Sequence, residues 1–283
     1  MKTFFLLIIF SQFIFADDPN KNSSLNSNYN LDVFEKIILS KVFDTLYTLS
    51  DYFVEIDLSK QIGYLHSRFD STKTFKVSTG TKKIKDGVET NTGIFVIQHK
   101  AQKWYSTQFD STLMLYWMGF NYGIGFHALL GKSYYKYLGN KTSSHGCVRV
   151  SREDAKELFN KLTYGSPVII HKGHTAIKIS FAEKKSDDYE YYENERLLKE
   201  INRRMNHLYE GNYFEFVKEK IIIDEKNVSH QGIPIGNYGK IPLRQKLNPE
   251  YYFLEIAMPE VKAETIPYNY FSTEKILNTL VAK

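Results

Sequence analysis

Short stretches in which apolar and polar residues alternate run through the middle of the chain, between residues 52 and 171. A period of two, in segments rich in β-branched and aromatic residues and separated by Gly, Asp, Ser or Lys, is typical of half-buried β-strands. The pattern therefore predicts a mainly β domain. Its strands are expected at residues 53–57, 61–65, 74–78, 93–97, 116–120, 124–127, 148–150 and 167–171.

Other segments have apolar residues three or four positions apart, which is the spacing of an amphipathic helix. One such helix is expected at residues 31–49, with the apolar residues Leu31, Phe34, Ile37, Ile38, Val42 and Leu46. A second is expected to begin after Ser151, which opens a sequence resembling a capping box, and to end near residue 162. A third is expected at residues 197–209 and is interrupted by Gly211.

The chain begins with Lys2 and an apolar run over residues 4–15 that contains two polar interruptions. This run is too short to span a bilayer, and an acidic, proline-containing sequence follows it, as in a cleaved secretory signal. We expect residues 1–16 to be a signal peptide cut after Ala16, although Ile14 stands where a small residue is preferred. A buried strand or a retained anchor helix is the alternative. No later segment has the apolar length of a membrane span, so no stable membrane insertion is expected.

The pattern becomes mixed after residue 176. Residues 183–193 are acidic and rich in tyrosine, like a linker, and residues 232–242 are rich in Gly and Pro. Short apolar segments occupy 214–217 and 221–223, a strand is expected at 251–256, and a terminal helix is expected at 273–281. The expected domains are a signal peptide at 1–16, a disordered lead-in with a helix at 17–50, a β domain at 51–175, and a C-terminal α+β region of unknown role at 176–283.

Composition changes this picture little. Of the 283 residues, 42% are hydrophobic and 15% are aromatic, which is enough for one medium domain with additional elements. The formal net charge of +5 is mild. We find no nucleic-acid-binding motif and expect no nucleic-acid partner. In an exported protein, positive charge favours contact with an anionic cell-wall polymer.

The only cysteine, Cys147, lies in the sequence SHGCVR at residues 144–149, downstream of His127. A thiol is a strong nucleophile as thiolate, and a nearby imidazole is the usual means of removing its proton. Gly146 has no Cβ, so it permits an unusual backbone angle and close approach of a substrate carbonyl. The alternative is that Cys147 is a small buried hydrophobe.

The neighbours of the cysteine favour the catalytic interpretation. Ser144, His145 and Arg149 supply donors and positive charge, which favour a thiolate and can hold a carboxylate. Export strengthens the argument, because exported chains normally pair their cysteines in disulfides and an unpaired thiol risks oxidation. A disulfide with a cysteine of another chain is the structural alternative.

Taken together, residues 52–172 resemble the catalytic domain of the L,D-transpeptidases, also called the YkuD family, which remodel peptidoglycan. The signature of that family is a histidine, a spacer, then Ser or Thr, His, Gly, Cys, a hydrophobic residue, and Asn or Arg. Here His127 is followed by 16 residues and then by SHGCVR. Residues 77–80, 89–95 and 124–127 also resemble glycine-containing segments of the family. Asn91 stands where many members have proline, and Arg149 takes the place of asparagine.

The resemblance implies a YkuD-like β-sandwich with short helices, and it implies roles for individual residues. Cys147 resembles the acylated nucleophile and His127 the general base, with the main-chain carbonyl of Ala128 orienting the imidazole. His145 resembles a supporting residue, and a purely structural role for it is the alternative. The amides of Gly146 and Cys147 are candidates for an oxyanion hole, with Ser144, Gly146 and Arg149 binding substrate. The aromatic residues Tyr116, Trp117 and Phe126 are candidates for lining the cleft or for the core.

The implied reaction is acyl transfer on peptidoglycan stem peptides. Cys147 would attack the carbonyl of the L-configured third residue of a tetrapeptide, expel D-alanine and form a thioester. An amine would then give a 3-3 crosslink, or a lipoprotein lysine would give a tethered protein. Resolution by water would make the chain an L,D-carboxypeptidase. No cofactor or metal is expected, and the expected location is the periplasm or cell wall. A non-catalytic wall-binding protein and a thiol protease or amidase remain the alternatives.

Overall fold

The computed structural model describes residues 41–107, 111–213 and 218–243. Several predictions lie outside these ranges. They are the signal peptide and lead-in, the part of the N-terminal helix at 31–40, the strand at 251–256, and the terminal helix at 273–281.

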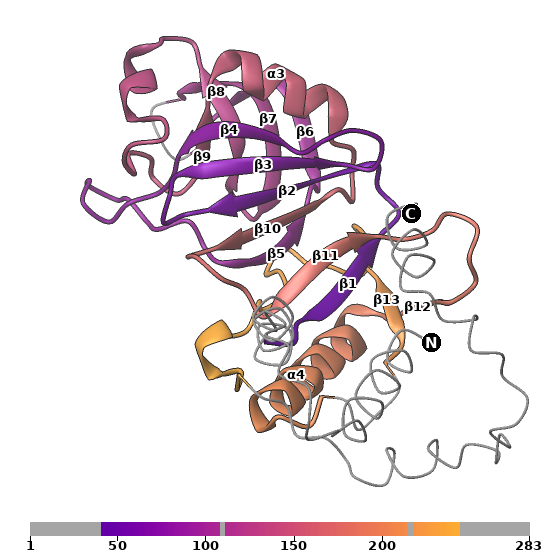
Figure 1. The fold of residues 1–283 in the computed structure, drawn as a ribbon. Coiled ribbons are helices and arrows are strands. Elements are labelled where there is room, and N and C mark those ends of the chain that lie inside the picture. Colours follow the sequence, from indigo (N-terminus) through magenta and orange to yellow (C-terminus); the bar gives the residue numbers. More distant parts are fainter. Residues whose placement is uncertain (1–40, 108–110, 214–217, 244–283) are drawn as a thin grey trace, which may run out of the picture. The chain divides into compact units, whose positions relative to one another are not determined.

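The larger sheet of the described residues has nine strands in the order β5-β10-β2-β3-β4-β9-β8-β7-β6 (Figure 1). Most neighbouring strands are antiparallel, but β10 is parallel to β2 and β9 is parallel to β8. The strands are β2 Tyr52–Asp57, β3 Ile62–Ser67, β4 Lys73–Ser78, β5 Gly93–Val96, β6 His99–Tyr105, β7 Leu113–Asn121, β8 Ile124–Leu129, β9 Val148–Val150 and β10 Pro167–His171. Every strand predicted between residues 53 and 171 is present, which confirms the mainly β fold class.

Strand β6 was not predicted from the sequence. It is the edge strand of this sheet, and its last four residues are exposed on both faces. A strand with no buried face lacks the alternation of apolar and polar residues on which the prediction depends.

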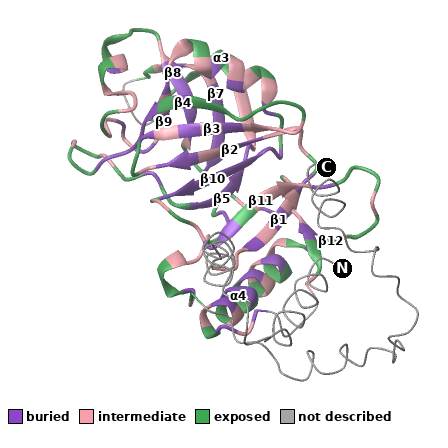
Figure 2. Ribbon diagram, viewed as in Figure 1, coloured by how far each residue is buried: buried purple, intermediate pink, exposed green. Residues whose placement is uncertain are grey.

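The sheet curls over a shared core, because residues from strands far apart in the strand order are in contact. Phe95 on β5 and Phe120 on β7 have ring centroids 5.6 Å apart, and Phe120 and Phe126 have ring centroids 5.1 Å apart. Strand β5 is at one edge of the sheet, whereas β7 is next to the other edge. Two halves of one curled sheet thus pack face to face around the core, as expected for a β-sandwich. The strand residues that form this core are coloured as buried in Figure 2.

Helix α3, Arg152–Lys161, covers part of this core. Ser151 is its N-cap, and the Ser151 hydroxyl accepts a hydrogen bond from the backbone N–H of Asp154, which confirms the predicted start. Ala155 and Leu158 are buried, and Leu162, at the C-cap, is fully buried. A short 3-10 helix, Ser133–Tyr137, lies in the segment between β8 and β9.

A second sheet of the described residues has the strand order β11-β1-β13-β12. Its strands are β1 Asp44–Thr48, β11 Ile177–Phe181, β12 Tyr189–Tyr191 and β13 Lys220–Ile222. The predicted helix at 31–49 is therefore wrong over residues 44–48. The reason is long-range pairing: β1 is parallel to β11 along its whole length and also pairs with β13, and local apolar spacing gives no sign of such partners.

Helix α4, Asn194–Glu210, packs with the second sheet. Leu197, Ile201, Met205 and Leu208 are buried, so the helix predicted from their spacing is confirmed. Gly211 ends it in the left-handed conformation, with φ of 78°, and its N–H bonds back to the last turn.

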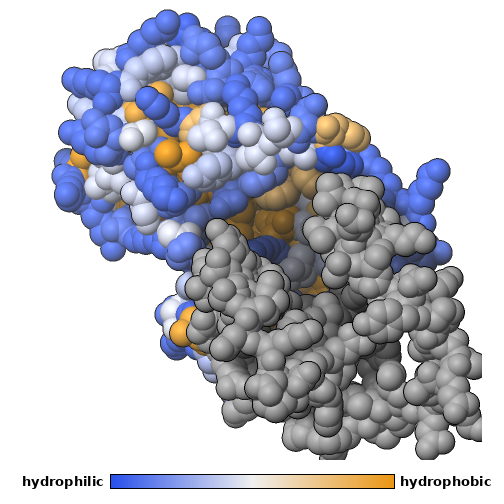
Figure 3. Space-filling model, viewed as in Figure 1, coloured by the Kyte–Doolittle hydropathy of each residue, from blue (hydrophilic) through white to orange (hydrophobic). Residues whose placement is uncertain are grey.

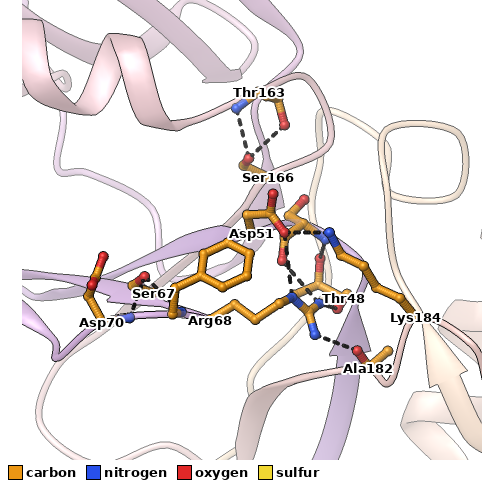
Figure 4. A network of polar contacts seen from close by, with 11 residues as sticks. Thr48, Asp51, Ser67, Arg68, Asp70, Thr163, Ser166, Ala182 and Lys184 are labelled. Carbon is orange, nitrogen blue, oxygen red and sulfur yellow. Dashed lines mark hydrogen bonds and ion pairs between the residues drawn. The ribbon is translucent and has the colours of Figure 1, made fainter.

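Arg68, just after β3, joins the two sheets (Figure 4). Its guanidinium donates to the carbonyl oxygens of Ala182 at 2.6 Å and Thr48 at 3.1 Å. Ala182 directly follows β11, and Thr48 is the last residue of β1. Asp51 lies 3.5 Å from the Arg68 Nε and 2.7 Å from the Nζ of Lys184. One arginine thus satisfies backbone carbonyls at the ends of β1 and β11.

The face of the described residues seen in Figure 3 is mostly hydrophilic, with small separate hydrophobic patches. Within the described ranges, no helix has the length and apolar character needed to cross a membrane.

Candidate active site

Strand pairing sets His127 beside the strand that begins directly after Cys147. His127 is on β8, and Cys147 comes one residue before β9. In this parallel pair His127 lies opposite Arg149. Residues directly opposite each other in a parallel pair share a face, so the side chains of His127 and Arg149 lie on one face of the sheet, and Arg149 comes two residues after Cys147. The intervening pair, Phe126 and Val148, is fully buried in the core.

The thiol of Cys147 lies against the turn between β7 and β8. Cys147 is half-buried, and its Sγ donates a hydrogen bond to the carbonyl oxygen of Gly123 at 3.7 Å. Burial raises the pKa of the Cys147 thiol, whereas the Gly125 N–H and the Arg149 guanidinium oppose that rise. The thiol is therefore protonated at rest, and a base must remove its proton for it to react.

His127 has the properties of such a base. It is 4% exposed, and its Nδ1 lies 3.3 Å from the carbonyl oxygen of Ala128, the orienting group expected from the sequence. A carbonyl oxygen can only accept, so Nδ1 carries the proton and Nε2 keeps its lone pair. Burial lowers the pKa of His127 to about 4, against the effect of the Ala128 carbonyl and with the help of Arg149. The imidazole is therefore neutral near pH 7.

Arg149 supplies a fixed positive charge beside both groups. Its Nη1 donates to the carbonyl oxygen of Ser143 at 3.0 Å. Its Nε is buried and has no hydrogen-bond partner among the described residues. Burial lowers the pKa of Arg149, but a guanidinium stays charged at any pH of interest. A buried, unpaired N–H is a donor available to an anionic ligand after a small side-chain movement.

Ser144 and Gly146 shape the backbone on the N-terminal side of the thiol. Ser144 is fully buried, and its hydroxyl donates to the carbonyl oxygen of Cys147. The same hydroxyl accepts the N–H of Gly146 at 3.2 Å. The Gly146 amide is thus bonded within the loop at rest, which leaves the Cys147 amide as the stronger oxyanion candidate of the two. Gly146 has a φ of +140°, and a Cβ there would lie 2.9 Å from Cγ2 of Val88.

A second segment, residues 79–90, holds this loop from the other side. The hydroxyl of Thr90 accepts the N–H of Gly80 at 2.9 Å and donates to the carbonyl oxygen of Gly146 at 2.6 Å. A Cβ on Gly80 would lie 2.6 Å from the Gly146 Cα. Two glycines and one buried threonine therefore fix the path of the backbone into Cys147.

His145 is half-buried in the same loop, and its carbonyl oxygen accepts the N–H of Val88 at 3.3 Å. Val88 also lines a cavity of about 270 Å³. The other residues of that cavity are Lys82, Glu89, Thr90, Asn91, Thr92 and Lys172. Val88 and Thr90 belong both to this cavity and to the contacts around Gly146, so the cavity lies beside the cysteine loop.

The aromatic residues considered for the cleft are largely structural. Trp117 is 4% exposed and Phe126 is fully buried, so both belong to the core. Trp117 still contributes to the site, because its ring lies 6.1 Å from the His127 ring, centroid to centroid. Tyr116 is half-buried and packs against Phe159, with ring centroids 5.8 Å apart.

Sequence reasoning missed the turn that touches the sulfur. The carbonyl of Gly123 and the N–H of Gly125 act through backbone atoms, and only the Gly in the turn between two apolar strands could have indicated them. It also missed the cavity lysines, Lys82 and Lys172, which are distant in sequence from Cys147. Among the described residues, no three His, Cys, Asp or Glu side chains are placed to hold a metal ion.

The comparisons with known proteins concern the segment that contains this site. A family model described as the L,D-transpeptidase catalytic domain, YkuD, matches residues 51–170. No curated protein matches the chain.

Three solved structures illustrate the structural comparison. An L,D-transpeptidase (Yku) from Stackebrandtia nassauensis is 26% identical with a TM-score of 0.37, and the match covers 43% of this chain and 56% of that one. An L,D-transpeptidase from Mycobacterium tuberculosis H37Rv is 20% identical with a TM-score of 0.37 and coverage of 43% and 58%. One from Mycobacterium smegmatis is 15% identical with a TM-score of 0.38 and coverage of 43% and 59%. The chain thus spans between 56% and 59% of the length of these three chains.

The family match and the signature at His127 and Cys147 fall within the same stretch of chain. The resemblance indicated by the sequence is confirmed: residues 51–170 match the catalytic domain of the YkuD family of L,D-transpeptidases.

Proposed function

We propose that this chain catalyses acyl transfer on peptidoglycan stem peptides, with Cys147 as the nucleophile. The observation that carries the proposal is the parallel register of β8 and β9. This register pairs His127 with Arg149, two residues after Cys147, within the segment that matches the L,D-transpeptidase catalytic domain, which supports a common site. The half-buried thiol favours this function over a non-catalytic wall-binding role, for which a sealed sulfur is expected.

In the first half of the proposed reaction, Sγ of Cys147 attacks the carbonyl carbon of the L-configured third residue of a tetrapeptide stem. Nε2 of the neutral His127 takes the thiol proton as the S–C bond forms. The imidazolium then returns that proton to the nitrogen of the departing D-alanine as the C–N bond breaks. A thioester and free D-alanine are the products. Burial of the imidazole supports this order, because it keeps the base unprotonated until the thiol gives up its proton.

Backbone N–H groups and a guanidinium are proposed to stabilise the negative charges of the oxyanion and of the substrate carboxylate. The N–H of Cys147 is proposed to stabilise the oxyanion, while Ser144 and Thr90 hold the adjacent peptide units in place. Arg149 is proposed to bind a substrate carboxylate through its unpaired Nε. His145 is proposed to support the loop. Direct substrate contact by Ser144 or Gly146 stays a prediction.

The cavity beside Val88 supports binding of an anionic peptide. It offers the ammonium groups of Lys82 and Lys172 and one carboxylate, Glu89, which lies 3.2 Å from the Nζ of Lys172. One positive charge is therefore left without a matching acid inside the cavity. Stem peptides carry free carboxylates, so the charge of the cavity matches that of the substrate.

In the second half, an acceptor resolves the thioester. An amine of another stem gives a 3-3 crosslink, a lipoprotein lysine gives a tethered protein, and water gives a tripeptide, the L,D-carboxypeptidase outcome. His127 removes the proton of the acceptor in each case, so the same site serves all three. We further propose that the protein acts in the periplasm or cell wall, where its substrate is found, after removal of residues 1–16.

The experiment that tests this function uses purified muropeptides with tetrapeptide stems. Wild type and Cys147→Ala are incubated with them, and products are identified by mass. Dimer formation by wild type alone supports transpeptidation, and tripeptide alone supports trimming. Unchanged substrate in both samples would contradict an enzymatic role. Acylation by a carbapenem gives a second measurement, because the added mass must fall on the peptide that contains Cys147.

A further inference from the structure

The turn that touches the thiol is held by a residue from the C-terminal region, His230. Strands β7 and β8 are joined through Tyr122 and Gly123, between the paired residues Asn121 and Ile124. Gly123 accepts the hydrogen bond of the Cys147 thiol. The position of this turn therefore sets the immediate surroundings of the sulfur.

Tyr122 has a conformation that an aromatic residue rarely adopts. Its φ is 48°, in the left-handed region, where a side chain with a Cβ is strained and where hairpin turns normally have Asn, Asp or Gly. Such strain persists only where surrounding contacts maintain it. At Tyr122 the contact is a ring stack on His230, with centroids 5.6 Å apart and an interplanar angle of 29°.

Asn121 provides a second link to the same residue. It is 3% exposed, and its amide nitrogen donates to the carbonyl oxygen of His230 at 2.6 Å. Its side-chain oxygen accepts from the amide of Asn91 at 3.0 Å, and Asn91 lines the cavity beside the cysteine loop. Both polar ends of a buried asparagine are thus used to join the turn, the cavity wall and the C-terminal region.

The segment around His230 is itself firmly attached to the larger sheet. Ile233 exchanges two backbone hydrogen bonds with Ile94 of β5, each 2.8 Å long. The carbonyl oxygen of Val228 accepts from the amide of Gln98 at 2.8 Å. These bonds lie on both sides of His230 in sequence, so the His230 ring is presented to Tyr122 from a fixed support.

We propose that His230 is a positioning residue of the active site, which acts through Tyr122 to hold the Gly123–Gly125 backbone against the Cys147 sulfur. The C-terminal region thereby completes the catalytic centre. The inference rests on the proposed nucleophile but not on any particular acceptor. The charged group that acts on the thiol is Arg149 on β9, which does not belong to the turn. His127, on the neighbouring strand β8, lies opposite Arg149.

The test measures thiol reactivity without peptidoglycan, so that its failure is distinct from failure of the proposed function. Full-length wild type, His230→Ala, His230→Phe and Tyr122→Ala are alkylated with iodoacetamide over a range of pH, and the rate at Cys147 is followed by mass. His174→Ala is the matched control. His174 is an exposed histidine just before the C-terminal region, and its ring lies 4.9 Å from that of Tyr238.

Loss of the ring stack loosens the Gly125 N–H that favours the thiolate. We expect the pH midpoint of alkylation to rise by about half a unit or more in His230→Ala, with the His174→Ala midpoint unchanged. His230→Phe keeps a stacking ring and should restore the wild-type midpoint. Because the two rings act as one unit, the double variant with Tyr122→Ala should shift no further than either single variant. A His230→Ala midpoint equal to that of wild type, in a variant with unchanged thermal unfolding, overturns the proposal. Additive shifts overturn it as well.

Discussion

The Nδ1 atom of His127 lies 3.3 Å from the carbonyl oxygen of Ala128, the next residue in the chain. This contact fixes the imidazole tautomer through the main chain, so no side-chain carboxylate is needed to orient the base. The other ring nitrogen, Nε2, is left with its lone pair free to accept a proton.

The pH dependence of Cys147 acylation should follow the protonation of His127. Its pKa is lowered to about 4, so the imidazole is charged below that pH and neutral above it. Acylation should therefore rise as the pH increases through about 4 and stay high to neutral pH. His127→Gln should lower the rate about 10²- to 10⁴-fold, and the rise in rate through about pH 4, the acid limb of the profile, should be lost. His99→Gln, a substitution on edge strand β6, is the control that should leave the profile unchanged. An acid limb that persists in His127→Gln would assign the limb to another group.

Gly146 should not tolerate a side chain. An added Cβ would lie 2.9 Å from Cγ2 of Val88, on a backbone with φ of +140°. We expect Gly146→Ala to lower stability by about 1–3 kcal/mol and to abolish acylation of Cys147. Gly131→Ala is the control, because a Cβ at Gly131 meets no atom within 4 Å. Thermal unfolding and carbapenem acylation of both variants give the comparison, and equal behaviour of the two would contradict the prediction.

Glu55 should stabilise the fold in a pH-dependent manner without affecting catalysis. Its carboxylate lies 2.9 Å from Nε2 of His171 and 2.9 Å from Nε2 of His66. These two hydrogen bonds lower the pKa of Glu55 to about 2, from an ordinary value of 4.5. A lowered pKa means that the folded state binds fewer protons, so the stabilisation is complete above pH 4.5 and is lost as the pH falls toward 2.

The substitution Glu55→Gln measures this contribution. At pH 7 it should reduce the free energy of unfolding by about 1–3 kcal/mol, and the difference from wild type should shrink near pH 3. Glu183→Gln, at an exposed position, should have no such effect. Denaturant unfolding at the two pH values is the measurement. A difference that grows on acidification would show that the sign is wrong.

Lys82 should contribute to substrate affinity through its charge. It lines the cavity beside the cysteine loop and has no ion-pair partner within 4.0 Å among the described residues. Lys82→Glu should raise KM for a stem peptide about 3- to 10-fold at low ionic strength, with less effect in high salt and little change in kcat. Lys85→Glu makes the same change of charge on the same loop but outside the cavity. Equal KM values for the two variants would exclude the cavity as a binding site.

The sequence predicted the larger sheet well because most of its strands bury one face or two. Segments such as β2 and β10 combine β-branched residues with clear turn residues, and both were found. The edge strand β6 and the short strand β12 are largely exposed and gave no pattern. The apolar spacing around strand β1 predicts part of a helix, but its stability comes from β11 and β13 and not from local preference.

The same distinction applies to the site. Cys147, His127 and Arg149 were identified because their spacing in the chain forms a signature, and the strand register brings them together. The backbone of Gly123 and Gly125 carries no side-chain chemistry, so the sequence marked residues 124–127 only as a glycine-containing segment and did not indicate their contact with the sulfur. His230 is far from Tyr122 in sequence, with strands β8 to β13 between them, and no local pattern links residues that meet only in the folded chain.

The place of β1 between β11 and β13 has a consequence for how the molecule is made. The chain enters the small sheet at β1, leaves it to form all nine strands of the large one, and returns at β11. During synthesis β1 has no strand to pair with until residues up to β11 have left the ribosome. The small sheet can therefore form only after the larger sheet, whose nine strands lie between β1 and β11 in sequence, has been synthesised.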